Sequence, residues 1–484
     1  MTTIKLDPGA ALLLDALHGA GHAAYAVGGC VRDSLLGLAP HDWDLCTSAR
    51  PEQVMALFGE EKCIPTGLQH GTVTVKQGGR LYETTTFRTE GAYSDGRHPD
   101  AVCFVPDVRE DLARRDFTIN AMAYSAEEGL IDPFGGRDDL AAHLVRAVGE
   151  PERRFEEDAL RILRLYRFAA RFGFAIDPAT GAAARALGPH LDCVSAERIQ
   201  EELLKLLAAP RPGSYLEPAV LAVILPELEP EKQPERFAEL CRTIDRIEPT
   251  AENVPARLAA LLWPLGEAGA RKALRKLKCS NALTDEVTAL EREAGGGAGS
   301  FLLGHEFELR HPADALCLER HSHPAGRCPN SNSLFPPQAA VVAVAGHSIA
   351  RPIACGNRVP PQRTVLGETP GTPNTTLTVQ AKRLLGRYEL PTIQRLTALC
   401  SARHPEQAGA FAALRAEAER LTAENACCRV SQLAVNGRDL MAAGVRPGPG
   451  LRQVLNALLE AVITGQTPNE KDALLAAAAQ FSAS

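Results

Sequence analysis

The sequence predicts an α+β protein, in which a small mixed α/β head is followed by all-α regions. Up to about residue 145, short β-type runs such as 72–75 and 81–87 alternate with helical stretches, and one of these opens near Pro51, a residue favoured in a first helical turn. From about residue 150 onward, long segments rich in Ala, Leu, Arg and Glu predict helices. We expect them at 157–172, 195–208, 254–278, 378–400 and 405–424.

The first strand of the head is expected at 25–27 and ends at a turn, Gly28-Gly29-Cys30-Val31-Arg32-Asp33. Because glycine has no Cβ, the backbone amides of Gly28 and Gly29 could approach a triphosphate closely. Arg32 would add a cation to such a site. The alternative is an ordinary turn.

Two carboxylates, Asp42 and Asp44, follow this turn and are separated by one residue. In an extended strand they point to the same face, while Trp43 and Leu45 point into the core. Carboxylates in one small space repel each other, and a hard divalent cation is the usual reason for such a pair. The pair therefore predicts a Mg²⁺ site for phosphoryl transfer, and the alternative is a solvated strand end.

Further motifs follow in order along the chain. They are Tyr82-Glu83-Thr84-Thr85-Thr86-Phe87-Arg88, Arg114-Arg115-Asp116-Phe117-Thr118-Ile119-Asn120-Ala121, Asp132-Pro133-Phe134-Gly135-Gly136, Glu157-Asp158-Ala159-Leu160-Arg161 and Ser195-Ala196-Glu197-Arg198-Ile199. Together with the glycine turn and the Asp pair, they resemble the nucleotidyltransferase superfamily, and within it the class II CCA-adding enzymes and bacterial poly(A) polymerases. The resemblance covers most of the first half of the chain.

The resemblance implies a role for each motif. Asp42 and Asp44 would hold one or two Mg²⁺ ions and act in catalysis. Glu83, which shares the inward face of its strand with Leu81 and Thr85, would be either a third catalytic carboxylate or a structural residue. The expected nucleotide-binding residues are Gly28, Gly29, Arg32, Arg114, Arg115, Asp116, Asn120, Asp158, Arg161 and Arg164.

Two of these motifs have a structural alternative. Arg114, Arg115 and Asp116 would contact the triphosphate and ribose, or else form a buried Arg–Asp pair that braces the domain. Asp132 and Gly135-Gly136 are expected to shape a hinge between the head and the next region rather than to touch substrate.

Base selection is predicted for the segment 157–171, where polar positions recur every three or four residues along one expected helix. Asp158 and Arg161 place an acceptor beside a donor fork, which matches the amino group and ring nitrogen of cytosine and adenine. Guanine and uracil present the reverse pattern, a mismatch of about 1–3 kcal/mol per unsatisfied buried group. The alternative is an i,i+3 salt bridge. Glu197 and Arg198 are expected to brace this helix.

RNA contacts are predicted further along the chain. The formal net charge of −7 argues mildly against nucleic-acid binding, but cations cluster locally. In 271–278, Arg271, Arg275 and Lys278 would share one helical face, and with Lys272 they form the expected RNA-binding set. The alternative is a solvated charged face. Glycines in 433–440 and 447–450 could open helices towards an RNA phosphate, or form ordinary turns.

By resemblance, the expected domains are a nucleotidyltransferase head (1–145), a neck for base recognition (146–225), and a body (226–317) and tail (376–484) that contact tRNA. Residues 318–375 hold nine prolines and are expected to be a disordered insert. A loop at about 89–109 is present, and by resemblance enzymes that add only CC tend to lack such a loop.

These observations predict an enzyme that uses CTP and ATP to build or repair the 3′-terminal CCA at the tRNA acceptor end. A poly(A) polymerase is the alternative within the family, and a non-catalytic tRNA-binding protein is the alternative outside it. Thirteen cysteines without CxxC spacing indicate reduced thiols, and no apolar run approaches a membrane span. We expect a cytoplasmic protein, with no membrane association and no obligate protein partner.

Overall fold

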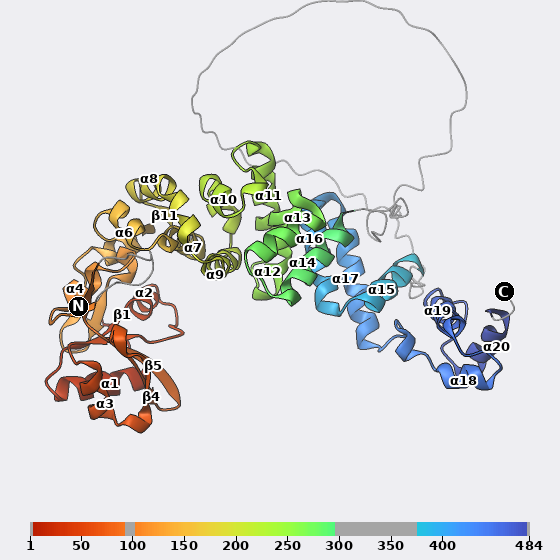
Figure 1. Ribbon diagram of the computed structural model, residues 1–484, viewed down its shortest axis with the longest axis horizontal. Coiled ribbons are helices and arrows are strands. Elements are labelled where there is room, and N and C mark those ends of the chain that lie inside the picture. Colours follow the sequence, from red (N-terminus) through yellow and green to blue (C-terminus); the bar gives the residue numbers. More distant parts are fainter. Residues whose placement is uncertain (1–2, 92–101, 296–374, 482–484) are drawn as a thin grey trace, which may run out of the picture.

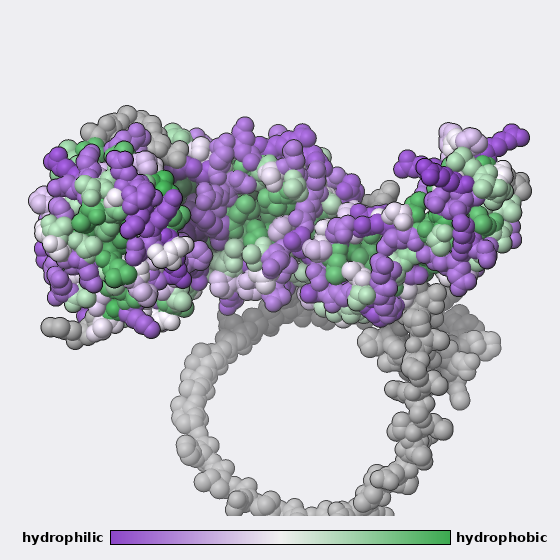
Figure 2. Space-filling view, turned by 90° about the horizontal axis from the view of Figure 1, so that it is seen from below, coloured by the Kyte–Doolittle hydropathy of each residue, from purple (hydrophilic) through white to green (hydrophobic). Residues whose placement is uncertain are grey.

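The computed structural model describes residues 3–91, 102–295 and 375–481, and the chain forms an elongated arc (Figure 1). The α/β head lies at the N-terminal end, and helices follow one another to the C-terminal end (Figure 1). The predicted fold class is confirmed. Viewed from below, most of the surface is hydrophilic, and apolar residues show mainly in patches on the head and on the helical regions (Figure 2). No helix of the described part is long and apolar enough to cross a bilayer.

The head is built on a seven-stranded sheet with the strand order β3-β4-β5-β2-β1-β8-β9. Its strands are β1 (Ala24–Val27), β2 (Leu45–Thr47), β3 (Cys63–Gly67), β4 (Thr72–Gln77), β5 (Arg80–Thr86), β8 (Ala123–Ser125) and β9 (Gly129–Ile131). Only β2 and β5 pair in parallel, with Leu45 opposite Thr84; the other neighbours are antiparallel. The strands expected at 25–27, 72–75 and 81–87 are all present.

Helices α1 (Pro8–Gly19) and α3 (Pro51–Phe58) pack against the sheet, and α3 opens at the predicted Pro51. Leu13 and Val54 join Val73 in one apolar core. The other head elements are α2 (Gly29–Leu35), β6 (Arg88–Glu90), β7 (Val102–Phe104), α4 (Val108–Ala113), the 3₁₀ turn η3 (Thr118–Asn120), α5 (Gly136–Ala141), and β10 (Leu144–Val145), which pairs with β11 (Ala175–Ile176). Strands β6 and β7 flank the expected loop, whose residues 92–101 lie outside the described chain.

The neck, as the term is used below, comprises α6 (Pro151–Glu157), α7 (Leu160–Phe172), α8 (Pro178–Ala186), α9 (Ala196–Leu207) and α10 (Pro218–Ile224). The single helix expected over 157–172 is wrong, because the backbone leaves the helix at Asp158 (φ −148°, ψ 103°). The Asp158 carboxylate accepts a hydrogen bond from the Leu160 amide (3.1 Å). Such local bonds let aspartate compete with helix continuation.

The helices that follow are α11 (Pro234–Arg246), α12 (Val254–Leu262), α13 (Gly266–Lys276), α14 (Asn281–Ala294), α15 (Thr375–Arg387), α16 (Leu390–Arg403), α17 (Ala408–Ala423), α18 (Gly437–Ala442), α19 (Pro449–Ile463) and α20 (Lys471–Phe481). Two long predicted helices are each split. The stretch 254–278 breaks at the 3₁₀ turn η8 (Trp263–Leu265), which contains Pro264, and 378–400 breaks before Pro391. Proline removes a helical hydrogen bond and disfavours helix in the preceding residue. The proposed insert, 318–375, lies outside the described residues except for Thr375.

Arg257 of α12 joins the neck to the following helices. Its side chain is fully buried and donates to the carbonyls of Leu207 (2.6 Å), Ala209 (2.5 Å) and Ile247 (2.5 Å). Leu207 ends α9, and Ile247 follows α11. Because the last carbonyls of a helix have no partner within the helix, one guanidinium stabilises two helix ends at once.

Candidate functional site

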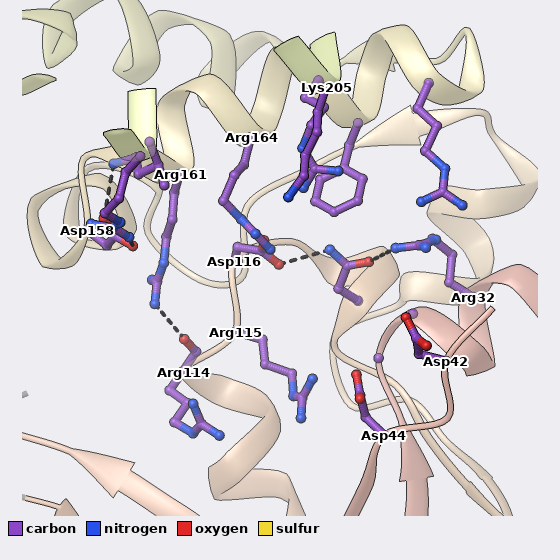
Figure 3. A pocket seen from close by; sticks show the side chains of 18 residues that line it. Arg32, Asp42, Asp44, Arg114, Arg115, Asp116, Asp158, Arg161, Arg164 and Lys205 are labelled. Atoms are coloured by element: carbon purple, nitrogen blue, oxygen red, sulfur yellow. Dashed lines mark hydrogen bonds and ion pairs between the residues drawn. The ribbon is translucent and has the colours of Figure 1, made fainter. Parts of the chain in front are cut away.

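A cavity of about 710 Å³ lies between the head and the neck (Figure 3). Every residue expected to bind nucleotide lines this cavity, although these residues come from in or beside α2, the α4–η3 segment and α7. Asp42 and Asp44 line it as well. Asp42 and Asp44 lie at one end of the view, and Asp158 and Arg161 lie at the other (Figure 3).

The glycine turn forms one wall of the cavity. Gly28 has φ 77°, which favours glycine, and a Cβ there would lie 2.9 Å from Arg115 Nη1. Helix α2 begins at Gly29. The Arg32 side chain is buried, donates to Asp33 (2.8 Å) and Asn120 (2.5 Å), and is therefore held rigidly beside the turn.

The two aspartates precede β2 rather than lie in it, because the strand begins at Leu45. The expected alternation is nevertheless present: Trp43 and Leu45 are buried, while Asp42 and Asp44 are exposed to the cavity. The pKa of Asp44 is raised to about 6, mainly because neighbouring protein atoms reduce the solvation of its carboxylate. The charges of Glu83 and Asp42 add to the rise, and the charge of Arg115 opposes it.

Glu83 lies beside Asp44, because the register that pairs Leu45 with Thr84 places the two preceding residues next to each other. The prediction that its strand face points inward is wrong. Leu81 on that face is 60% exposed, whereas Tyr82 and Thr84 on the opposite face are buried. Glu83 therefore stands on the open face of the sheet and is not among the residues that line the cavity.

One carboxylate, that of Asp111, holds both Arg114 and Arg115 in position. Asp111 is fully buried and lies 2.8 Å from Arg114 Nη2 and 3.3 Å from Arg115 Nη2. Burial would raise the pKa of Asp111, but the two guanidinium groups outweigh it and lower the pKa. The sequence analysis did not single out Asp111, although its i,i+3 and i,i+4 spacing to two arginines was a usable signal.

Asp116 forms a buried pair with Arg164 of α7, whereas Arg114 and Arg115, the arginines of the structural alternative, pair with Asp111. One oxygen accepts from Arg164 Nε (2.9 Å), and the other accepts from Asn120 (3.0 Å) and the Phe117 amide (2.8 Å). Burial alone would raise the pKa of Asp116, but Arg164 and Asn120 hold it well below its usual range. The pair therefore ties the head to α7 at the centre of the cavity.

Asp158 and Arg161 do not form the i,i+3 salt bridge. Asp158 accepts from Arg198 Nη2 of α9 (2.8 Å), and Arg161 donates to Glu157 (2.9 Å) and to the Arg114 carbonyl (3.0 Å). Arg198 thus braces the segment as expected, whereas Glu197 is exposed. The two base-recognition candidates remain separate groups on one cavity wall.

Several lining residues were missed as site residues by the sequence analysis. Arg167, Phe168 and Arg171 of α7 and Lys205 of α9 also face the cavity. Arg167 lies over the Phe168 ring (4.0 Å to the centroid) and is ion-paired to the buried Glu202. The recurrence of basic residues every three or four positions along α7 was the signal that could have found Arg167 and Arg171.

Two predicted groups lie elsewhere. Asp132 accepts from the Gly136 (2.7 Å) and Arg137 (2.9 Å) amides, which fixes the start of α5. In the RNA-binding set, Lys278 lies beyond the end of α13, so the shared helical face is wrong for that residue, whereas Arg271 and Arg275 lie one turn apart on α13 and Arg271 is ion-paired with Asp285 (3.0 Å). Lys272 and Arg275 are exposed.

Three family models match the chain. They are the Poly A polymerase head domain at residues 24–146, the Probable RNA and SrmB-binding site of polymerase A at 173–232, and the tRNA nucleotidyltransferase domain 2 at 392–478. Together they extend from the first strand of the head to the last helix.

Curated relatives carry one name. A CCA-adding enzyme of Leuconostoc citreum is 44% identical over 252 residues, which is 52% of this chain but only 60% of that enzyme. A CCA-adding enzyme of Lactiplantibacillus plantarum is 32% identical over 465 residues, 96% of this chain and 93% of that enzyme.

Solved structures agree. The crystal structure of the Bacillus stearothermophilus CCA-adding enzyme in complex with CTP superposes with a TM-score of 0.68 at 29% identity, covering 98% of each chain. The Thermotoga maritima CCA-adding enzyme complexed with tRNA_CCA has a TM-score of 0.59 at 19% identity and covers 98% of this chain and 96% of that one. At that identity the second likeness shows the fold alone.

Proposed function

This chain belongs to the CCA-adding enzyme family, and we propose that it adds C, C and A to the 3′ end of tRNA, using CTP and ATP without a nucleic-acid template. The observation that carries the proposal is that all ten expected nucleotide-binding residues line one cavity together with Asp42 and Asp44. The tRNA nucleotidyltransferase model in the C-terminal region supports tRNA as the second substrate.

The reaction joins the RNA 3′-oxygen to the α-phosphorus of the nucleotide and breaks the bond from that phosphorus to the bridging oxygen, so that pyrophosphate leaves. The Gly28 amide already donates to the Met122 carbonyl (3.1 Å), so of the two glycines Gly29 would present its backbone amide to the triphosphate, and Arg32 and Arg115 would stabilise the charge of the triphosphate. Both arginines lie beside the glycine turn, because a Cβ at Gly28 would be 2.9 Å from Arg115 Nη1 and one at Gly29 would be 3.6 Å from Arg32 Nη2.

The residues present fit a divalent cation. Asp42 and Asp44 supply oxygen ligands, and the pKa of Asp44 is raised mainly by loss of solvation and then by the charges of Glu83 and Asp42, so a cation beside it would favour the ionised carboxylate. No three His, Cys, Asp or Glu side chains form a ready-made metal cluster in the described chain. One or two carboxylates together with substrate phosphates are a usual ligand set for Mg²⁺, and Asp42 and Asp44 would supply the carboxylates. When bound, Mg²⁺ would activate the attacking oxygen and neutralise charge on the leaving pyrophosphate.

Glu83 would assist from the open face. Its position beside Asp44, next to the exposed Leu81 on the same strand face, would allow it to orient the RNA 3′-hydroxyl. Asp42 and Asp44 would then act on the nucleotide side and Glu83 on the RNA side.

Base choice would reside in Asp158 and Arg161. Each already makes contacts that fix its position, yet a carboxylate has about four lone-pair sites and a guanidinium has five N–H donors. Arg198 and the Leu160 amide occupy two acceptor sites of Asp158, so others remain for a base amino group. This arrangement supports acceptance of CTP and ATP and rejection of GTP and UTP.

A poly(A) polymerase is the remaining alternative, because the matched head model is named for that activity. A non-catalytic tRNA-binding protein is disfavoured by the presence of both aspartates and of the whole lining set.

The test uses the purified chain, Mg²⁺ and a tRNA transcript that ends at the discriminator base. We expect CTP alone to extend it by two nucleotides, CTP with ATP by three, and neither GTP nor UTP to be used. Long adenosine tracts from ATP alone would establish the polymerase instead, and no extension under any nucleotide mixture would contradict both.

A further inference from the structure

The cavity holds more cations than the nucleotide site accounts for. Nine basic side chains line it, and their exposures fall into two groups. Seven are 4–33% exposed, whereas Arg171 and Lys205 are 46% and 50% exposed. Arg171 and Lys205 are therefore the two most exposed cations of the lining, and the proposed chemistry uses neither.

Lys205 also lies at the junction between the neck and the helices that follow. It is in the last turn of α9, two residues before Leu207, whose carbonyl is bound by the buried Arg257 of α12. Helix α9 lies between α7 and α12 in the arc (Figure 1). An RNA that follows the later helices towards the cavity must pass this end of α9.

In the close view, Lys205 reaches from the α9 wall towards the space between the Asp158 end and the Asp42 end (Figure 3). Its ammonium is paired with Glu201 (2.7 Å), an exposed i,i+4 pair. Arg171 is paired with Asp33 (3.1 Å) and lies over Phe172. Exposed lysine–glutamate ion pairs are weak, so an RNA phosphate can replace Glu201 as the partner of the Lys205 ammonium.

We propose that Lys205 binds the phosphates of the terminal nucleotides of the RNA acceptor strand where it enters the cavity. This proposal rests on the proposed function. The triphosphate is expected beside Gly28 and the 4%-exposed Arg32, close to Arg171, which shares Asp33 with Arg32, so Lys205 on α9 remains for the second polyanionic substrate. A lysine acts as a mobile point charge, which suits a strand that must shift as each nucleotide is added.

The experiment compares the full-length chain with Lys205→Ala and Lys205→Arg. The matched control is Lys232→Ala, because Lys232 forms an equivalent exposed pair with Glu229 (2.7 Å) and is not among the residues that line the cavity. Two quantities are measured: the Kd for an RNA minihelix that ends at the discriminator base, as a function of salt, and the KM values for that RNA and for CTP.

For Lys205→Ala we expect the RNA Kd and KM to rise about three- to tenfold at low salt. The plot of log association constant against log salt should become less steep by about 0.7, the value for one lost phosphate contact to a single strand. The CTP KM should stay unchanged. Lys205→Arg and Lys232→Ala should resemble the parent chain.

An unchanged RNA Kd and salt slope in Lys205→Ala would overturn the proposal. So would a rise confined to the CTP KM, which would place Lys205 on the triphosphate, or a Lys205→Arg variant as weak as Lys205→Ala. Because RNA binding is measured apart from turnover, a parent chain that binds RNA but adds no nucleotide would contradict the proposed function while leaving the Lys205 test decisive.

Discussion

Arg198 Nη2 donates to Asp158 Oδ2 at 2.8 Å, so the residue expected to recognise the base amino group is fixed by a second helix. Asp158 lies in the break between α6 and α7, where no helical backbone holds it. Arg198 therefore provides the orientation that the broken helix does not. Base choice consequently depends on α9 as well as on the segment that carries Asp158.

Asp158→Ala should reduce the use of CTP and ATP together and weaken discrimination against UTP and GTP. Loss of one base contact in a buried site costs about 1–3 kcal/mol, or roughly 5- to 150-fold in kcat/KM. Steady-state kinetics with all four nucleotides on a tRNA that lacks CCA measures this loss. Glu197→Ala is the matched control, because Glu197 is exposed next to Arg198. Unchanged selectivity in a folded Asp158→Ala chain would refute the base-recognition role.

Asp42→Asn and Asp44→Asn should each stop nucleotide transfer while leaving CTP and tRNA affinity nearly intact. These carboxylates serve the cation rather than the RNA. Removal of a group that only orients a metal ligand lowers metal affinity or activity by about 10- to 100-fold, so removal of a ligand itself should lower the transfer rate by at least about 100-fold. Single-turnover assays at saturating RNA measure the rate, and equilibrium titration with CTP measures binding. If either variant transferred nucleotides at the rate of the parent chain, the substituted aspartate would not be a metal ligand.

Much of the site could be predicted from the sequence because its residues lie in short motifs. Gly28, Asp42 and Asp158 are each recognisable within a few residues of their own neighbours. Their convergence on one cavity, however, follows from tertiary packing of α7 against the head, which the resemblance implied and the residues alone did not.

The partners of these residues were harder to predict. Asp158 was expected to lie beside Arg161 on one helix. Instead, the Asp158 carboxylate accepts a hydrogen bond from the Leu160 amide where the helix is interrupted, and it accepts another from Arg198 of α9. Lys205 was missed because an exposed lysine on an amphipathic helix has no local signature. Its position in the cavity depends on how α9 packs against α7.

Arg257→Ala should destabilise the junction between the neck and the later helices. The substitution would leave the carbonyls of Leu207, Ala209 and Ile247 buried without their donor. Each such group costs about 1–3 kcal/mol, so for the three carbonyls we expect a loss of at least about 3 kcal/mol. Hydrogen exchange at the ends of α9 and α11 measures the local opening free energy. Arg242→Ala, which removes an exposed i,i+3 pair with Glu239, should change it by less than about 0.5 kcal/mol.

Glu291 predicts a specific pH dependence of stability. It is 4% exposed on α14, and its Oε1 has no hydrogen-bond partner among the described residues. Burial raises its pKa to about 8; the charge of Arg403 opposes this rise and that of Glu267 adds to it. In the unfolded chain a glutamate titrates near pH 4.3. Between these two values the native state keeps a proton that the unfolded state has released, so stability falls as pH rises through this window.

Glu291→Gln keeps the shape of the side chain and cannot ionise, so it should remove this dependence. Near pH 5 the variant and the parent should unfold at similar temperatures. As pH rises towards 8 the parent should lose stability relative to the variant, by up to about 1.4 kcal/mol per pH unit, and the difference should level off above pH 8. Thermal unfolding of both chains from pH 5 to 9 measures it, with the exposed Glu156→Gln as control. A parent that gained stability relative to Glu291→Gln with rising pH would show that Glu291 is ionised and paired in the native state.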